Sequence, residues 1–356
     1  MDGQVPPCQQ QATRRYGGSH GGQGSSGCQP LGSANMHPTC QSLPAGNPPA
    51  PGFSKAYGSA LRPTQAGAGG GQGDSQGTFK AGGAGGAAVH IVVSGSMELD
   101  GTISVDGGNG LPGHDDNGSG GGAGGSILIE VGTLVDSSGT LTANGGQGGS
   151  SHSHHKNDGG GSGSGGRIAV HCSAGQSSGL SFEAYSPLAS YPDQTQLAGG
   201  PGTSFVDCGN VTRTLIVDSR RGGFYTYDCS LDTSRGAHNG APQCRDRAWI
   251  TDNETRFDFD LIQLYNQAHL AFAPPVPAGG EPVIVAVGEL GGDRTGTLWS
   301  GSGQLVALGT SSVEVVTGGL CHAIAPHHMV QPPRFLAQNV NKPCHSVGSS
   351  GLHFHK

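Results

Sequence analysis

The chain has 356 residues, 68 of them glycine, and its formal net charge at pH 7 is -7. Hydrophobic residues other than glycine make up 33% of the sequence, and charged residues make up 12%, against roughly 25% in soluble domains, which argues against an ordinary enzyme core. The low charge and the lack of a basic block exclude the electrostatic footprint of a nucleic-acid-binding protein. A collagen triple helix is also excluded, because the glycines have no strict three-residue period.

The N-terminal segment, 1–75, is rich in Pro, Gln, Ser and Gly and shows neither alternation nor a helical period. Such a segment cannot offset its ordering entropy, so we expect it to be disordered. Its start, MDGQVPPCQQQATRRYGG, lacks the apolar stretch of a signal peptide. The longest aliphatic run, Pro282 to Val287, is too short to cross a bilayer, so no membrane span is predicted.

Residues 76–211 contain a repeat built from two kinds of short strand. The first kind follows a glycine cluster and occurs as GGAAVHIVV (85–93), GGSILIEV (124–131), GGRIAVHC (165–172) and GTSFVDC (202–208). The second kind occurs as GTISVDGGNG (101–110), GTLTANGGQG (139–148) and LSFEAYS (180–186). Equivalent positions are 89, 127 and 168 in the first kind and 103, 141 and 182 in the second. Both kinds therefore advance by the same offset at each step, and the whole unit repeats in register.

Alternation along the strands predicts which side chains stack. The first kind forms three apolar columns: Val89, Ile127 and Ile168; Ile91, Ile129 and Val170; Val93, Val131 and Cys172. Its opposite face is mixed and is expected to be solvated or loosely covered; it holds His90, Leu128, Ala169, Val92, Glu130 and His171. In the second kind the columns are Ile103, Leu141 and Phe182, and Val105, Ala143 and Ala184, while Thr102, Thr140 and Ser181 face away.

A unit with one apolar column per strand cannot bury its inner face alone and must stack on its neighbours. We therefore predict an all-β fold, a glycine-rich parallel β-solenoid or β-helix, with glycine at the tight corners. The inserts 111–125 and 147–166 are expected to be loops expelled on one face. The alternative is a flexible, elastomeric glycine-rich coil, but flexibility alone would not keep two kinds of strand in register.

Glycine thins out over residues 212–320, which we interpret as further, irregular solenoid turns or as a small β region that caps the stack. Strands are expected at 214–219, 257–265, 281–290, 295–301, 303–309 and 311–319. The only candidate for an amphipathic helix is 261–272. The Pro-, His- and Ser-rich tail, 321–356, is expected to be disordered.

Nine cysteines fall at irregular spacing without a CxxC motif, which favours disulfides over a zinc or thioredoxin-type site. Cys172 and Cys208 each end a strand of the first kind. If these strands stack on consecutive turns, the two Cα atoms should lie roughly 5 Å apart, a separation that a disulfide tolerates.

Three sequons, at Asn117, Asn210 and Asn253, permit N-glycosylation in a secretory pathway. With the cysteines, they favour an extracellular or cell-surface location. A fragment of a larger secreted protein would reconcile that location with the missing signal peptide.

The strings GGAGGSILIEVGTLVDSSGTLTANGGQG and GGGSGSGGRIAVHC, followed by GGPGTSFVDCGNVTRTLIVDS, resemble the glycine-rich repeats of large secreted or surface proteins of protists, algae and some bacteria. Those repeats run GGGGGSI, GTISANGGNG, GGGGGRIAI, GGAGTVY and LIVDN, and the match covers roughly residues 80–220. The resemblance implies an extracellular structural or adhesive segment, often one part of a longer chain. It carries over no catalytic residue.

Two polar clusters lie in the glycine-flanked inserts. His152, His154 and His155, with Asp158, offer imidazoles suited to zinc, copper or nickel, but a loop of this kind lacks the outer hydrogen bonds that orient metal ligands. The run His114 to Asn117 offers oxygen ligands for calcium but matches neither an EF-hand nor the calcium-binding nonapeptide repeat. We interpret both clusters as solvated inserts and predict no metal.

Glu130, His171 and Asp207 are predicted to form one outward column, the arrangement in which β-helix enzymes place acid and base groups. The simpler interpretation is a solvated polar face. We therefore expect a structural or adhesive extracellular protein without catalysis or a cofactor, with glycans or other matrix components as partners. The alternative is a carbohydrate-binding or carbohydrate-active β-helix protein of the lyase or hydrolase type.

Overall fold

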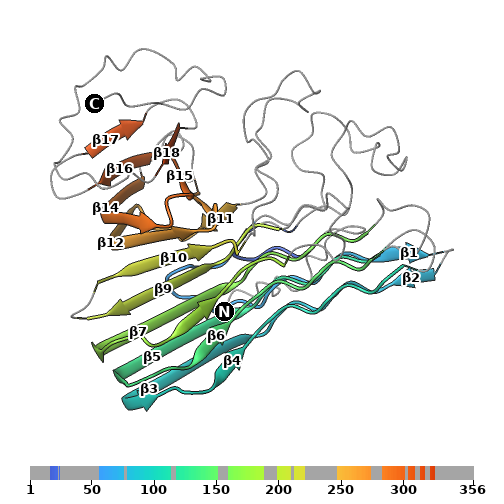
Figure 1. Ribbon diagram of the computed structural model, residues 1–356, viewed down its shortest axis with the longest axis horizontal. Coiled ribbons are helices and arrows are strands. Elements are labelled where there is room, and N and C mark those ends of the chain that lie inside the picture. The colour runs from blue at the N-terminus through green and yellow to red at the C-terminus, as the bar shows by residue number, and fades with distance from the viewer. Residues whose placement is uncertain are drawn as a thin grey trace, which may run out of the picture.

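The computed structural model describes residues 17–22, 24, 56–75, 78–113, 118–150, 159–187, 199–209, 212–220, 247–273, 283–300, 304–308, 313–316 and 321–324. Across these residues the chain is built from strands, without a helix, and most strand pairs are parallel (Figure 1). The predicted all-β class is therefore confirmed.

The largest sheet has nine strands, which are parallel except at the β9/β10 and β16/β17 pairs. From one edge to the other it runs β17 (Val313–Val316), β16 (Gln304–Leu308), β14 (Val283–Gly292), β12 (Arg256–Tyr265), β10 (Thr214–Asp218), β9 (Thr203–Cys208), β7 (Arg167–Gly175), β5 (Ser126–Val135) and β3 (Ala88–Glu98).

In the described part of the chain, three smaller sheets accompany it. A parallel three-stranded sheet comprises β4 (Thr102–Ser104), β6 (Thr140–Thr142) and β8 (Ser181–Glu183). A four-stranded sheet comprises β11 (Arg247–Ile250), β13 (His269–Phe272), β15 (Thr297–Ser300) and β18 (Cys321–Ile324). The short antiparallel hairpin of β1 (Gly73–Ser75) and β2 (Thr78–Lys80) completes the set.

The strand registers agree with the predicted columns. Val89 pairs with Ile127 and Ile127 with Ile168, and the same offsets pair Ile103 with Leu141 and Leu141 with Phe182. The side chains of these columns form one apolar core between the nine-stranded and the three-stranded sheet. The sequence repeat therefore describes successive layers of strands, each hydrogen-bonded to the next.

The opposite face of the large sheet is more covered than the sequence analysis expected. Leu128 and Ala169 are 2% and 0% exposed, and they belong to a second core with Ala60 and Leu61. Residues 56–65 lie across this face, although disorder was expected for the whole segment 1–75. The expectation fails there because an irregular segment can be ordered by the apolar surface on which it packs.

The prediction that the inserts 111–125 and 147–166 are expelled loops is wrong for their glycine-rich parts. These parts are extended segments that run side by side, away from the strands toward β1 and β2 (Figure 1). We call them the glycine bundle, which comprises residues 17–22, 66–72, 82–87, 105–110, 118–125, 143–149 and 159–166. Backbone hydrogen bonds join the segments to one another.

The central segment of the bundle, 118–125, shows how it is held together. Successive N–H groups of this segment donate in turn to three neighbouring segments, 66–72, 159–166 and 105–110, and every third residue returns to the same neighbour. The bonds are Gly120 to Gly71 and Ala123 to Ala68, Gly121 to Gly161 and Gly124 to Ser164, and Gly122 to Gly108 and Gly125 to Val105. Its carbonyl groups accept from three further segments, through Gly83 and Gly86, Gly18 and Gly146. This rotation matches the three residues per turn of the polyproline II conformation, which makes no hydrogen bonds within itself.

Glycine is required in this bundle because the backbones approach closely. A Cβ atom at Gly122 would overlap the carbonyl oxygen of Ala84, and one at Gly124 would overlap that of Ala143. The local three-residue order of hydrogen bonds therefore exists without the strict three-residue glycine repeat of collagen.

After residue 212 the chain forms strands where the aliphatic patterns predicted them, and most of these strands extend the large sheet. The segment 261–272, the only helix candidate, forms the end of β12, a turn and then β13. Asn266 and Gln267 make that turn with φ angles of 56° and 60°, the left-handed region that Asn tolerates best among non-glycine residues. The alternation of Phe257, Phe259 and neighbouring apolar residues therefore prevails over helical spacing.

Candidate functional site

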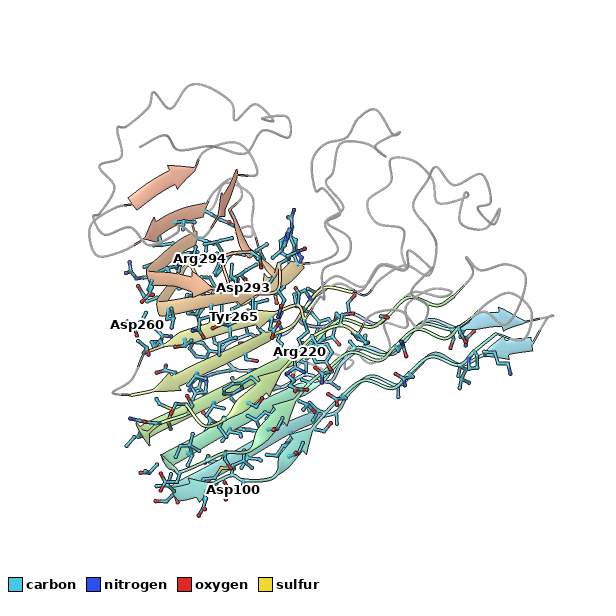
Figure 2. All side chains as sticks on the ribbon, in the orientation of Figure 1. Asp100, Arg220, Asp260, Tyr265, Asp293 and Arg294 are labelled. Carbon is cyan, nitrogen blue, oxygen red and sulfur yellow. A yellow bond between two sulfur atoms is a disulfide. The ribbon has the colours of Figure 1, made fainter. Side chains whose placement is uncertain are left out.

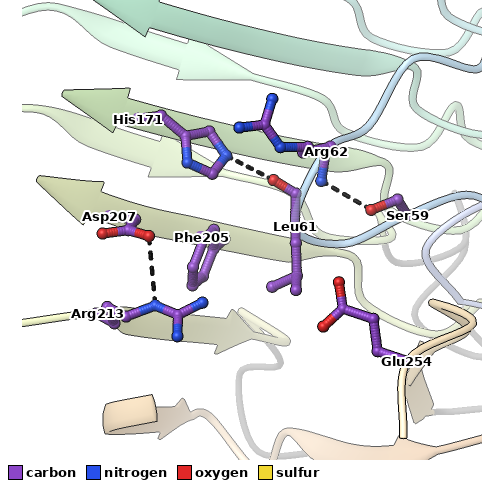
Figure 3. Close-up of a pocket in the computed structure, with 8 residues that line it drawn as sticks. All are labelled: Ser59, Leu61, Arg62, His171, Phe205, Asp207, Arg213 and Glu254. Carbon is purple, nitrogen blue, oxygen red and sulfur yellow. Dashed lines mark hydrogen bonds and ion pairs between the residues drawn. The ribbon is translucent and has the colours of Figure 1, made fainter. Parts of the chain in front are cut away.

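A groove of about 260 Å³ opens on the outward face of the large sheet (Figure 3). It lies beside the ends of β7 and β9, under the segment that crosses this face. The residues that line it are Ser59, Leu61, Arg62, His171, Phe205, Asp207, Arg213 and Glu254.

The strand registers place Glu130 beside His171 and His171 beside Asp207 in one column. The groove takes in only the last two of them. Glu130 lies outside it, hydrogen-bonded to Arg62 and, at 2.7 Å, to His90 Nε2. These bonds, first from His90 and then from Arg62, lower the pKa of Glu130, so its carboxylate remains charged.

His171 is held at the wall of the groove. Its Nε2 lies 2.7 Å from the carbonyl oxygen of Leu61, and since a carbonyl only accepts, Nε2 carries the proton. The imidazole also meets the ring of Phe205 edge to face, with centroids 5.6 Å apart. Phe205 is 0% exposed, so it shapes the floor of the groove and is not a surface on which a sugar ring could stack.

The two carboxylates of the groove have different surroundings. Asp207 forms an ion pair with Arg213, with 3.3 Å between oxygen and Nε. Burial and the nearby charge of Asp252 raise the pKa of Glu254, and Arg213 partly opposes them. Asp252 is itself engaged, since it accepts hydrogen bonds from Ser59 and from the N–H of Ala60.

The segment that covers the groove is anchored by Arg167, which is fully buried. Its guanidinium donates to the carbonyls of Tyr57 and Trp249 at 2.9 and 2.8 Å and to the hydroxyls of Thr203 and Thr251. Burial lowers its pKa to about 10, against the raising effect of Asp252. One side chain of the repeat thus joins β9, β11 and the covering segment.

His20 anchors the bundle in a similar way. The side chain is 0% exposed, and its Nδ1 lies 2.8 Å from the Gly124 carbonyl oxygen. The backbone N–H of His20 donates to Ser164 Oγ. Burial and the charge of Arg167 lower its pKa to about 3. The imidazole is therefore neutral in the folded protein at physiological pH.

Sequence reasoning placed His171 and Asp207 but missed the rest of the groove. Arg62 and Ser59 lie in the segment expected to be disordered, and Arg213 and Glu254 lie beyond the repeat. None of the four belongs to a periodic pattern. Only the packing of distant segments brings them to the column.

Several predicted sites lie outside the described residues: His152, His154, His155, the run 114–117, Asn117 and Asn210. Asn253 is exposed between β11 and β12. Within the part of the chain that is described, no group of three or more His, Cys, Asp or Glu side chains is arranged to hold a metal ion.

Cys172 and Cys208 lie at disulfide distance, with Cα atoms 4.2 Å apart. They occupy paired positions on β7 and β9. The predicted proximity of the two thiols is therefore confirmed.

The described residues include no helix that is long and apolar enough to cross a membrane. In comparisons with known proteins, no family model, no curated protein and no solved structure matches the chain.

Proposed function

We propose that the chain is a structural or adhesive element of an extracellular or cell-surface protein, and that its repeats form a parallel β-solenoid without intrinsic catalysis. The observation that carries this proposal is the double hydrogen-bonding of each layer. A layer pairs with the next through its strands and, beyond the strands, through its glycine segment.

This construction favours a stiff spacer over an elastic coil. An elastomer needs glycine segments that exchange conformations, whereas the N–H groups of residues 120–125 all have carbonyl partners in the bundle. Stacked layers of this kind act as quasi-one-dimensional rods, in which each layer contacts mainly its neighbours.

An extracellular location is supported by the paired cysteines, since disulfides persist in oxidising compartments. The exposed Asn253 sequon is compatible with a glycoprotein. The likeness of the repeat to those of large surface proteins points the same way.

We propose that catalysis is absent because the side chains of the outward column, Glu130, His171 and Asp207, are already engaged. Glu130 is bonded to Arg62 and His90, His171 to a backbone carbonyl, and Asp207 to Arg213. Each of these three groups of the column is engaged by a partner within the chain. A general acid or base must instead reach the substrate proton it transfers.

The test is an activity panel with pectin, alginate, chitin and β-glucan, read as new reducing ends and as unsaturated products. We expect no turnover above that of a heat-inactivated sample. Turnover that disappears in both Asp207→Asn and Glu254→Gln would overturn the proposal and favour a hydrolase or lyase.

A second candidate, carbohydrate binding, is favoured by the groove itself. Charged pairs such as Arg213 with Asp207 present donors and acceptors side by side, which suits the hydroxyl groups of a glycan. Arg213→Ala should then abolish the signals that the parent chain gives on a glycan array, while Arg256→Ala on the exposed part of β12 should keep them. An array without signals for the parent chain would remove this candidate and leave the spacer.

A further inference from the structure

The edge of the large sheet at β3 is open. Among the described residues, β3 pairs with β5 on one side and with no strand on the other, and it lies at the margin of the sheet in Figure 1. All of its residues are at least partly exposed. Val92, on the outward face, is 68% exposed. A long edge strand of this kind presents a row of unpaired backbone groups that a further strand can bond.

The usual protection of an edge is weak over the first half of β3. Charged side chains normally prevent edge-to-edge pairing, yet between Lys80 and Glu98 the one ionisable residue is His90. A bulge follows Val93, which leaves residues 88–93 as a regular stretch.

The two ends of this edge carry opposite charge. Lys80, at the end of β2, precedes His90 by as many positions as Asp100 follows it, and Glu98 lies beside Asp100 at the far end of β3 (Figures 1 and 2). The segment 82–87 and the strand rise by nearly equal amounts per residue, about 3.1 and 3.3 Å. The basic and acidic ends therefore lie on opposite sides of His90 along this edge.

We propose that this edge binds a second copy of the same chain, as an antiparallel β3 pair about a two-fold axis at His90. An isologous contact requires a surface that is complementary to itself, and a strand with a basic and an acidic end meets this requirement when it is reversed. In this register Val92 faces the partner's Ala88, and the basic end of each copy lies toward the acidic end of the other.

The apolar core also continues across the contact. A two-fold axis perpendicular to the sheet keeps each face on its own side, so Val89 lies opposite the partner's Ile91 within the apolar layer. Both side chains are only partly buried in the single chain, where they pack against the core between the two sheets. The second copy would cover this open end of the core.

The oligomeric state of the full chain tests the proposal, by sedimentation equilibrium over a concentration series at low and at high salt. We expect a dimer for the parent chain. Lys80→Glu should weaken it at least tenfold, and the combination of Lys80→Glu with Glu98→Lys and Asp100→Lys should restore it. Glu289→Lys, an exposed change on β14, is the matched control and should leave the dimer intact. A monomer at all concentrations, or no rescue by the charge reversal, would overturn the proposal.

The register has a test of its own. A residue on a two-fold axis faces its own copy, so His90→Cys should give a covalent dimer under mild oxidation, above the background of the parent chain. Val92→Cys, two positions further along the strand, should not. Far-UV circular dichroism establishes that each variant is folded. Equal cross-linking at the two positions would refute a two-fold axis at His90.

Discussion

Gly122 lies in the central segment of the glycine bundle, and its replacement by alanine tests the packing argument directly. A Cβ at this position would overlap the carbonyl oxygen of Ala84. The residue also donates a hydrogen bond to Gly108 and accepts one from Gly146. One methyl group would therefore push residues 118–125 away from residues 82–87 and strain the hydrogen bonds of Gly122 to Gly108 and Gly146.

The size of the effect follows from these contacts. Overpacking of a rigid site costs about 1 to 3 kcal/mol, and two strained backbone hydrogen bonds add about 1 kcal/mol each. We expect Gly122→Ala to lower the free energy of unfolding by about 3 to 5 kcal/mol, a large part of the stability of a typical domain.

The matched control is Gly101→Ala. A Cβ at Gly101 meets no atom within 4 Å, so the substitution should be neutral or stabilise the fold by up to about 1 kcal/mol through the unfolded chain. Urea unfolding followed by circular dichroism and Trp fluorescence measures both variants. Equal losses of stability, or a silent Gly122→Ala, would refute the reasoning.

Three further predictions concern the cores and the buried imidazole. Ile129→Asp should unfold the repeat in thermal melts because it buries an unpaired charge, whereas Thr140→Asp on the outer side of β6 should be nearly silent; the opposite ranking would contradict the face assignment. Replacing both Cys172 and Cys208 by serine should lower the free energy of urea unfolding by about 3 to 4 kcal/mol, because a disulfide would close a loop with a sequence separation of 36. A variant as stable as the oxidised parent would contradict a bond between the two thiols. The pKa of His20 is lowered from 6.5 to about 3, so between these pH values His20 is protonated in the unfolded chain and neutral in the folded chain. Stability should therefore fall as the pH decreases from 6.5 toward 3, and His20→Asn should flatten that dependence; an unchanged slope would contradict the buried, neutral imidazole.

The layers of strands were predictable from the sequence because their information is local and repeated. Alternation assigns each side chain to a face, and the offset shared by the two kinds of strand aligns Val89 with Ile127 and Ile168. The same alignment brought Cys172 to Cys208, since their strands start from equivalent glycine clusters. No distant segment had to be known for these inferences.

The glycine bundle and the groove depended on tertiary structure. A glycine segment carries no side chain that reports its neighbours, so nothing local distinguishes a flexible loop from residues 118–125 surrounded by six other segments. The groove combines Arg62 from the covering segment, His171 and Asp207 from the repeat, and Glu254 from beyond it. These residues meet because the irregular segment 56–65 covers the outward face of the large sheet, which alternation alone would leave exposed to solvent. The buried side chain of Arg167 holds this segment in place.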